Sequence, residues 1–196
     1  MRDFIRYYKW HLIFFLIVAI CTVYVVVKVT EDKSADLIVG YFGTQYANDQ
    51  TFNDNFPMWK ELLHDYNEDG EKKAAMYTII YDRQRDIDDD FPDVVDSDQY
   101  DLYISTKETF ENFEDKTRFE DVEAYLDTQG EKAPMLKDSS GRIYAVSIED
   151  NDYATYMGLN SSKDIYIAVA APQKGDELTT NKKNARNIAQ YIIEEG

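Results

Sequence analysis

The run from Leu12 to Val27 constrains this chain more than any other feature, because its sixteen residues include no charge, no proline and no glycine. A helix of that length covers about 24 Å, which is short of a hydrocarbon core of about 30 Å. Trp10 before the run and Lys28 after it suit the two membrane interfaces and extend the span. We therefore expect an uncleaved transmembrane anchor over residues 12–28.

The charges on either side of this run predict its orientation. Three basic residues and one acidic residue precede it, whereas the chain beyond it is strongly acidic. The positive-inside rule then places the N-terminus in the cytoplasm. We expect a cytoplasmic segment over residues 1–11, a linker over 29–35 and an extracellular domain over 36–196, in a single-pass protein of the cell membrane.

Two other interpretations of the run fit less well. A cleaved signal peptide needs a shorter apolar core and a small-x-small exit, which residues 22–26 do not offer. A lipoprotein signal would use Cys21, but Ile20 precedes it where a small residue is needed. Cys21 is also the only cysteine of the chain, so no disulfide can stabilise the domain that follows.

The composition of the chain limits its partners. It has 38 Asp and Glu against 21 Lys and Arg, which gives a formal net charge of −17. That sign disfavours nucleic acid and anionic lipid headgroups and favours cations and basic surfaces. The 16 tyrosines argue against a disordered tail. We expect one folded acidic domain beyond the anchor and no nucleic-acid partner.

Apolar patterns in this domain alternate between strand and helix. Residues 36–43 form a nearly continuous apolar run, which is typical of a buried strand. Helical spacing follows from Phe52 to Tyr66, and residues 74–81 alternate as a strand does. Further strands are predicted over 102–104, 143–148 and 165–171, with turn residues at 138–141 and an amphipathic helix over 185–193. This alternation predicts an α/β fold with a central, largely parallel sheet flanked by helices.

Two local patterns complete this prediction. Residues 82–101 contain many aspartates, and because like charges repel one another we expect mostly loop there. Ser105 and Glu108 have the spacing of a capping box, which predicts that a short helix begins after Ser105.

The sharpest motif is D-x-N-x-D-G over Asp65 to Gly70, the first half of an EF-hand calcium loop. The candidate Ca²⁺ ligands are Asp65, Asn67, Asp69 and the carbonyl of Glu71. Position twelve of the loop is Met76 where a bidentate Glu should stand, so a carboxylate from elsewhere, such as one of the Asp86 to Asp90 cluster, would have to replace it. The alternative is a plain turn that ends the preceding helix at Gly70.

The sequence offers little support for catalysis. It contains no Gly-x-Ser-x-Gly elbow, no phosphate-binding glycine loop and no cysteine outside the apolar run. His11 borders the run and His64 stands alone on the first predicted helix. We expect no enzyme, and a hydrolase that uses the Asp-rich segment is kept only as an alternative.

Several segments resemble the extracellular solute-binding proteins of bacterial ABC importers. Those that carry the resemblance are Asp36-Leu-Ile-Val-Gly40, Asp101-Leu-Tyr-Ile-Ser-Thr-Lys-Glu-Thr-Phe110, Gly141-Arg-Ile-Tyr-Ala-Val146, Asp164-Ile-Tyr-Ile-Ala-Val-Ala-Ala171 and Asn184-Ala-Arg-Asn-Ile-Ala-Gln-Tyr191. The chain has about half the length that two lobes require, so the resemblance implies a single periplasmic-binding-protein-like lobe. The chain resembles still more closely the small single-pass Firmicutes membrane proteins of unassigned role that carry a reduced version of this fold.

The resemblance also implies where a ligand would bind. Open α/β sheets form their crevice at the C-terminal ends of the strands. By position that crevice would be lined by Thr44, Gln45, Tyr46, Asp82, Arg83, Ser105 and Thr106. We expect a non-enzymatic module that binds a small solute or a partner membrane protein such as a permease. The alternative is a calcium-stabilised scaffolding domain with no solute ligand.

Overall fold

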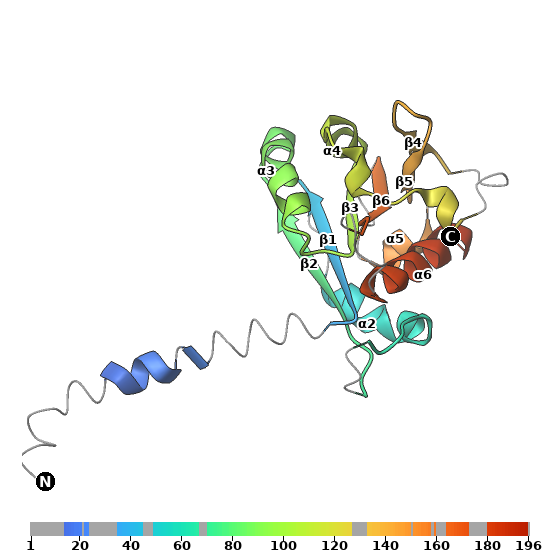
Figure 1. Ribbon diagram of the computed structural model, residues 1–196. Coiled ribbons are helices and arrows are strands. Elements are labelled where there is room, and N and C mark those ends of the chain that lie inside the picture. The colour runs from blue at the N-terminus through green and yellow to red at the C-terminus, as the bar shows by residue number, and fades with distance from the viewer. Residues whose placement is uncertain are drawn as a thin grey trace, which may run out of the picture. The chain divides into compact units, whose positions relative to one another are not determined.

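The computed structural model describes residues 14–20, 22–23, 35–44, 49–66, 70–126, 133–149, 151–157, 159, 164–172 and 180–195 (Figure 1). It divides the chain into two units, residues 1–35 and 36–196. In the first unit, residues 14–20 and 22–23 are helical and exposed. Among the described residues no helix is both long enough and apolar enough to cross a membrane. The predicted cytoplasmic segment 1–11, the linker residues 29–34 and the remainder of the predicted anchor lie outside the described residues.

The second unit alternates strands and helices, as the apolar patterns predict. Its strands are β1 (Leu37–Gly43), β2 (Ala74–Ile80), β3 (Leu102–Thr106), β4 (Met135–Lys137), β5 (Ile143–Ser147) and β6 (Ile165–Val169). Its helices are α2 (Asp49–Trp59), α3 (Gln84–Asp96), α4 (Lys107–Asn112), α5 (Asp152–Tyr156) and α6 (Thr180–Glu195), with 3₁₀ turns η1 (Lys60–Leu62), η2 (Lys116–Arg118) and η3 (Val122–Ala124). The prediction of an α/β domain is confirmed.

The six strands form one mixed sheet in the order β2-β1-β3-β6-β5-β4. β1 runs parallel to β2 and β3, whereas β6 is antiparallel to β3 and β5, and β4 is antiparallel to β5. Three of the five strand pairings are therefore antiparallel, and the prediction of a largely parallel sheet is wrong. The turn at 138–141 accounts for one of these pairings, because so short a connection between β4 and β5 can join only antiparallel neighbours.

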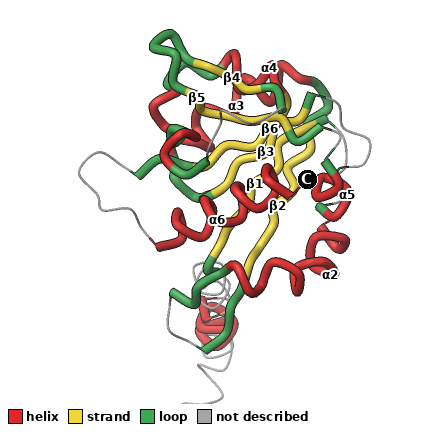
Figure 2. The backbone as a smooth tube through the Cα atoms, turned by 90° about the vertical axis from the view of Figure 1, so that its right-hand side faces the viewer, coloured by secondary structure: helices red, strands yellow, loops and turns green. Residues whose placement is uncertain are grey.

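The helices cover both faces of the sheet. The chain crosses from β1 to β2 through α2 and returns past β1 to β3 through α3, and right-handed crossovers in opposite directions place the two helices on opposite faces. Figure 1 shows α3 and α6 on opposite sides of the strands, and Figure 2 views the sheet from the side that α6 covers. The domain thus has three layers with two separate cores.

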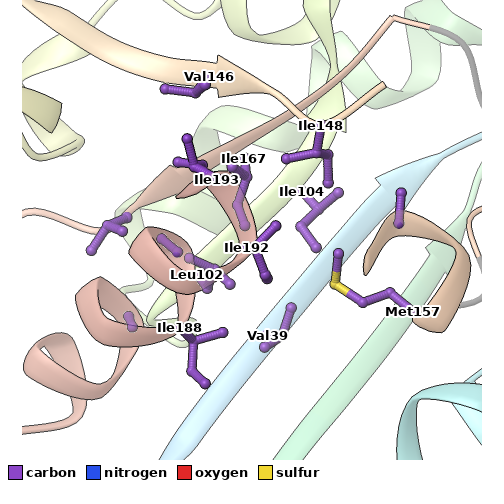
Figure 3. Packing of buried hydrophobic residues seen from close by; sticks show 14 of the residues in the cluster. Val39, Leu102, Ile104, Val146, Ile148, Met157, Ile167, Ile188, Ile192 and Ile193 are labelled. Carbon is purple, nitrogen blue, oxygen red and sulfur yellow. The ribbon is translucent and has the colours of Figure 1, made fainter. Parts of the chain in front are cut away.

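Strand alternation divides the apolar side chains between these cores. Val39 of β1 and Ile104 of β3 belong to the core beneath α6, whereas Phe42 and Tyr103 of the same strands belong to the core beneath α3 and α4. Figure 3 shows the first core, in which isoleucines of α6 lie over the sheet. Its labelled members are Val39, Leu102, Ile104, Val146, Ile148, Met157, Ile167, Ile188, Ile192 and Ile193.

The Asp-rich segment is a helix for most of its length, so the prediction of a loop is wrong. Ile87, Phe91 and Val95 follow one another at a spacing of four, and all three are buried against the sheet. The acidic side chains lie on the other side of α3, where water screens their repulsion. Arg83 pairs with Asp86, and Arg85 with Asp89, which offsets part of that repulsion.

A buried carboxyl group lies at the start of β3. The side chain of Asp101 accepts a 2.8 Å hydrogen bond from the backbone N–H of Ile38, which ties the beginnings of β1 and β3 together. Burial raises the pKa of Asp101 to about 6, although the Ile38 N–H and the nearby Lys182 act in the opposite direction. The ammonium group of Lys182 itself donates to Asp98 at 3.0 Å.

This raised pKa predicts the effect of an Asp101→Asn substitution on stability. The folded-state pKa lies above the unfolded value. The carboxyl therefore contributes most to the free energy of unfolding below about pH 4, and it loses that contribution as the pH rises through 6. Asparagine can still accept from Ile38 but cannot ionise. We expect the variant to be about 1 to 2 kcal/mol more stable than wild type at pH 7.5, after allowing for the lost attraction to Lys182. Urea denaturation across this pH range measures the difference, and a variant that is less stable at pH 7.5 would contradict the prediction.

Candidate functional site

The candidate site lies at one edge of the sheet, where β1 and β3 end. Because these strands are parallel, their C-terminal ends share this edge, and α3 and α4 both begin there. β6 is antiparallel to β3 and pairs Ile165 with Thr106, so it brings its own N-terminal end to the same place. A hollow of about 420 Å³ opens here, within the usual range of ligand sites. Its lining residues are Gln84, Thr106, Lys107, Glu108, Glu111 and Asp164.

A hydrogen-bond network fixes the walls of this hollow. The amide group of Gln84 donates to Thr109 at 2.6 Å and to Asp88 at 2.9 Å, and its oxygen accepts from the Thr106 hydroxyl at 3.2 Å. The other Asp88 oxygen accepts from Asn112 at 2.7 Å. These bonds join the first turn of α3 to α4, so Gln84 and Thr106 are held in place before any ligand arrives.

Thr106, not Ser105, caps the helix α4. Its hydroxyl accepts from the Thr109 backbone N–H, whereas Ser105 is fully buried and donates to the carbonyl of Phe42 at 2.7 Å. The capping-box prediction is thus wrong by one residue. Ser105 joins β3 to β1 instead and does not face the hollow, so its predicted place in the crevice is also wrong.

The hollow carries an excess of negative charge. Glu108, Glu111 and Asp164 contribute carboxylates, and Lys107 is the one cation among the lining residues that the structure describes. The ammonium group of Lys107 lies 3.6 Å from the Glu111 carboxylate, which offsets one of the three negative charges. The remaining charges favour a ligand that brings a cation, and Gln84 and Thr106 add neutral hydrogen-bonding groups.

The structure places the predicted crevice residues in different surroundings. Thr106 lines the hollow, whereas Thr44, Asp82 and Arg83 are exposed and are not part of the lining. Arg83 is paired with Asp86, and this hydrogen bond raises the pKa of its guanidinium. Gln45 and Tyr46 lie outside the described residues.

Most of the residues that line the hollow are not among the predicted crevice residues. Gln84 directly follows Arg83, which is one of the predicted crevice residues. Because a loop is expected over 82–101, the sequence does not indicate that Gln84 begins a helix. The helix α4 directly follows Thr106 and carries Lys107, Glu108 and Glu111. The predicted C-terminal end of β3 is therefore the sequence feature that could have indicated these three residues. Asp164 joins the site only because β6 is antiparallel, and nothing in the sequence analysis indicated that.

The candidate calcium loop is described only in part. One oxygen of Asp65 accepts from the backbone N–H of Gly70 at 2.8 Å, and the other is buried and has no hydrogen-bond partner among the described residues. Gly70 has a φ of 83°, which suits both a calcium loop and a plain turn. Glu71 lies 3.2 Å from Lys73. Asn67 and Asp69 lie outside the described residues, and the part of the chain that is described contains no cluster of three or more metal-binding side chains.

Comparisons with protein-family models, with curated proteins and with solved structures found no match to this chain.

Proposed function

We propose that the chain is a non-enzymatic binding module, built like one lobe of an extracellular solute-binding protein, and that the hollow beside β3 takes a small polar solute bearing an ammonium group. The observation that carries this proposal is the position of the hollow. It lies at the C-terminal ends of parallel strands, which is where open α/β sheets bind their ligands. In this proposal residues 12–28 anchor the module and the acidic domain lies outside the cell.

The chemistry of the lining supports an ammonium ligand. Glu108 and Asp164 offer carboxylates that no described cation of the lining offsets, and Gln84 and Thr106 offer oxygens held by the network described above. A basic segment of a partner membrane protein, such as a permease, would present the same groups as a free amine. In both cases the hollow recognises a cation beside hydrogen-bonding groups.

A Glu108→Gln substitution tests this site. Glu108 is exposed and keeps its shape as glutamine, so the change removes charge and little else. We expect it to weaken spermidine binding by about three- to fivefold, because an exposed ion pair contributes up to about 1 kcal/mol. Isothermal titration of the full chain in about 0.15 M salt measures the change, since that salt screens distant charges. The matched control is Glu123→Gln on η3, and an equal loss in both variants would mean that spermidine responds only to overall charge.

A calcium-stabilised scaffolding domain is the second candidate, and the unpartnered Asp65 oxygen favours it. Asp65→Asn retains the acceptor for Gly70 but removes the charge that a cation needs. We expect about 10 mM Ca²⁺ to raise the melting temperature of wild type by several degrees relative to EGTA if the dissociation constant is about 10⁻⁴ M. The Asn variant should not respond. A wild-type melting temperature that is the same in calcium and in EGTA would remove this candidate.

A further inference from the structure

The helix α6 has a second face that is separate from its buried stripe. Lys183, Arg186, Asn187 and Gln190 recur at the spacing of neighbouring helical turns, while Ala185, Ile188, Ala189 and Ile192 pack into the core. With His64, Tyr66 and Tyr125, these four polar residues line a second hollow of about 450 Å³. It is lined by different residues from the hollow beside β3.

Arg186 is held in this hollow by two contacts. Its guanidinium pairs with both oxygens of Glu120, whose side chain is 3% exposed. The guanidinium carbon also lies 5.9 Å from the centre of the Tyr125 ring. Glu120 uses the Nε and Nη2 atoms, so the Nη1 edge of the group is not engaged by that pair. A cation fixed in this way loses little conformational entropy when a ligand binds.

The charge of this hollow is opposite to that of the first. Among the described residues its lining contains Lys183 and Arg186 and no carboxylate, in a chain that has 38 acidic residues. Glu120 offsets the charge of Arg186, so Lys183 supplies the net positive charge. Lys183 is exposed, and no ion pair joins it to the described residues. Burial, followed by the charge of Glu120, raises the pKa of Tyr125, so this side chain stays a neutral phenol and adds no negative charge. The lining therefore favours an anion.

Three rings give the hollow flat walls. The Tyr125 ring lies beside Arg186, and the centres of the His64 and Tyr66 rings lie 5.9 Å apart with the rings tilted by 45°. Aromatic walls beside fixed cations match a ligand that has a flat ring and an anionic group. We propose that this second hollow binds a small aromatic anion, whose carboxylate or phosphate meets Lys183 and Arg186 while its ring lies against Tyr66 and Tyr125.

Phenyl phosphate is the probe for this site. We expect saturable binding to the full chain with a dissociation constant of about 1 mM, and amide shifts in a two-dimensional NMR spectrum over residues 64–66 and 183–190. Lys183→Gln should weaken binding by about five- to tenfold, because it removes one charge-assisted contact. The matched control is Lys137→Gln. Lys137 is an exposed lysine on the strand β4 that does not line this hollow, so the substitution should leave the affinity unchanged.

Further probes separate the anion from the ring, and this site from the first. Benzoate should bind through the same residues if any anionic group suffices, whereas phenol should bind much more weakly. Absence of saturation by both phenyl phosphate and benzoate, or an equal loss in the Lys183 and Lys137 variants, would overturn the proposal. Spermidine binding beside β3 should not change in Lys183→Gln. The two proposed sites can therefore be disproved independently of each other.

Discussion

Replacing Phe119 by alanine is expected to lower the free energy of unfolding by about 3 to 5 kcal/mol. Phe119 is fully buried between the sheet and the helices α3 and α4. Its ring centre lies 5.4 Å from those of Phe110 and Phe113 and 5.7 Å from that of Tyr103. The substitution removes these ring contacts and leaves a cavity that rigid neighbours cannot fill, so both the transfer and the cavity penalties apply.

Urea denaturation of the full chain measures this loss. Phe119→Leu is the matched control, because it retains most of the volume and removes only the ring geometry, so its loss should be clearly smaller. The same cluster holds α4, which carries Thr106 and Glu108 at its N-terminal end, and spermidine affinity should therefore fall in the alanine variant too. A loss of less than about 1 kcal/mol in Phe119→Ala would contradict the packing described for this core.

Asn184→Ala is expected to cost about 2 kcal/mol, since it removes the partner of one buried backbone carbonyl, that of Asp36, and of two partly buried backbone groups of His64. Asn184 is fully buried on α6. Its oxygen accepts from the His64 N–H at 2.9 Å, and its amide donates to the carbonyls of Asp36 at 2.8 Å and His64 at 3.0 Å. One side chain thus joins α6 to the start of β1 and to the segment that follows η1. Alanine can replace none of these bonds, and water has little access to the buried carbonyl of Asp36.

The matched control for this prediction lies one turn along the same helix. Asn187 makes a single hydrogen bond of 3.5 Å to the Leu62 carbonyl and is only partly buried, so Asn187→Ala should cost less than about 1 kcal/mol. Chemical denaturation of both variants compares them directly. Equal losses would show that the hydrogen bonds of Asn184 contribute no more than the single bond of Asn187, because alanine has the higher helix propensity and propensity alone would produce no loss.

Sequence patterns predict best those helices that have a single buried stripe of apolar residues. The spacing of Ala185, Ile188, Ala189, Ile192 and Ile193 predicts α6, and each of these residues is buried beneath it. The helix α3 has an equally regular stripe, but the density of aspartates over the same residues favours a loop, so the two patterns give opposite predictions. Charge on one face of a helix is compatible with folding, since water and neighbouring arginines stabilise it.

The sheet and the site show where local patterns stop being informative. A strand pattern does not specify which neighbour a strand will pair with, so β6 was expected in a parallel sheet and is antiparallel to β3. Asp164 enters the hollow through that pairing alone. Thr106 was predicted because it ends a strand, and the C-terminal end of a strand is a property that the sequence itself carries.

The most direct test of the proposed function is a two-dimensional NMR titration of the full chain with spermidine. Binding at the proposed site predicts saturable shifts of the amides of Gln84, Thr106 to Glu111 and Asp164. The affinity for spermidine obtained from these shifts should fall in Glu108→Gln. Shifts confined to the exposed aspartates of α3, or none that saturate, would contradict a binding site at the ends of β1 and β3.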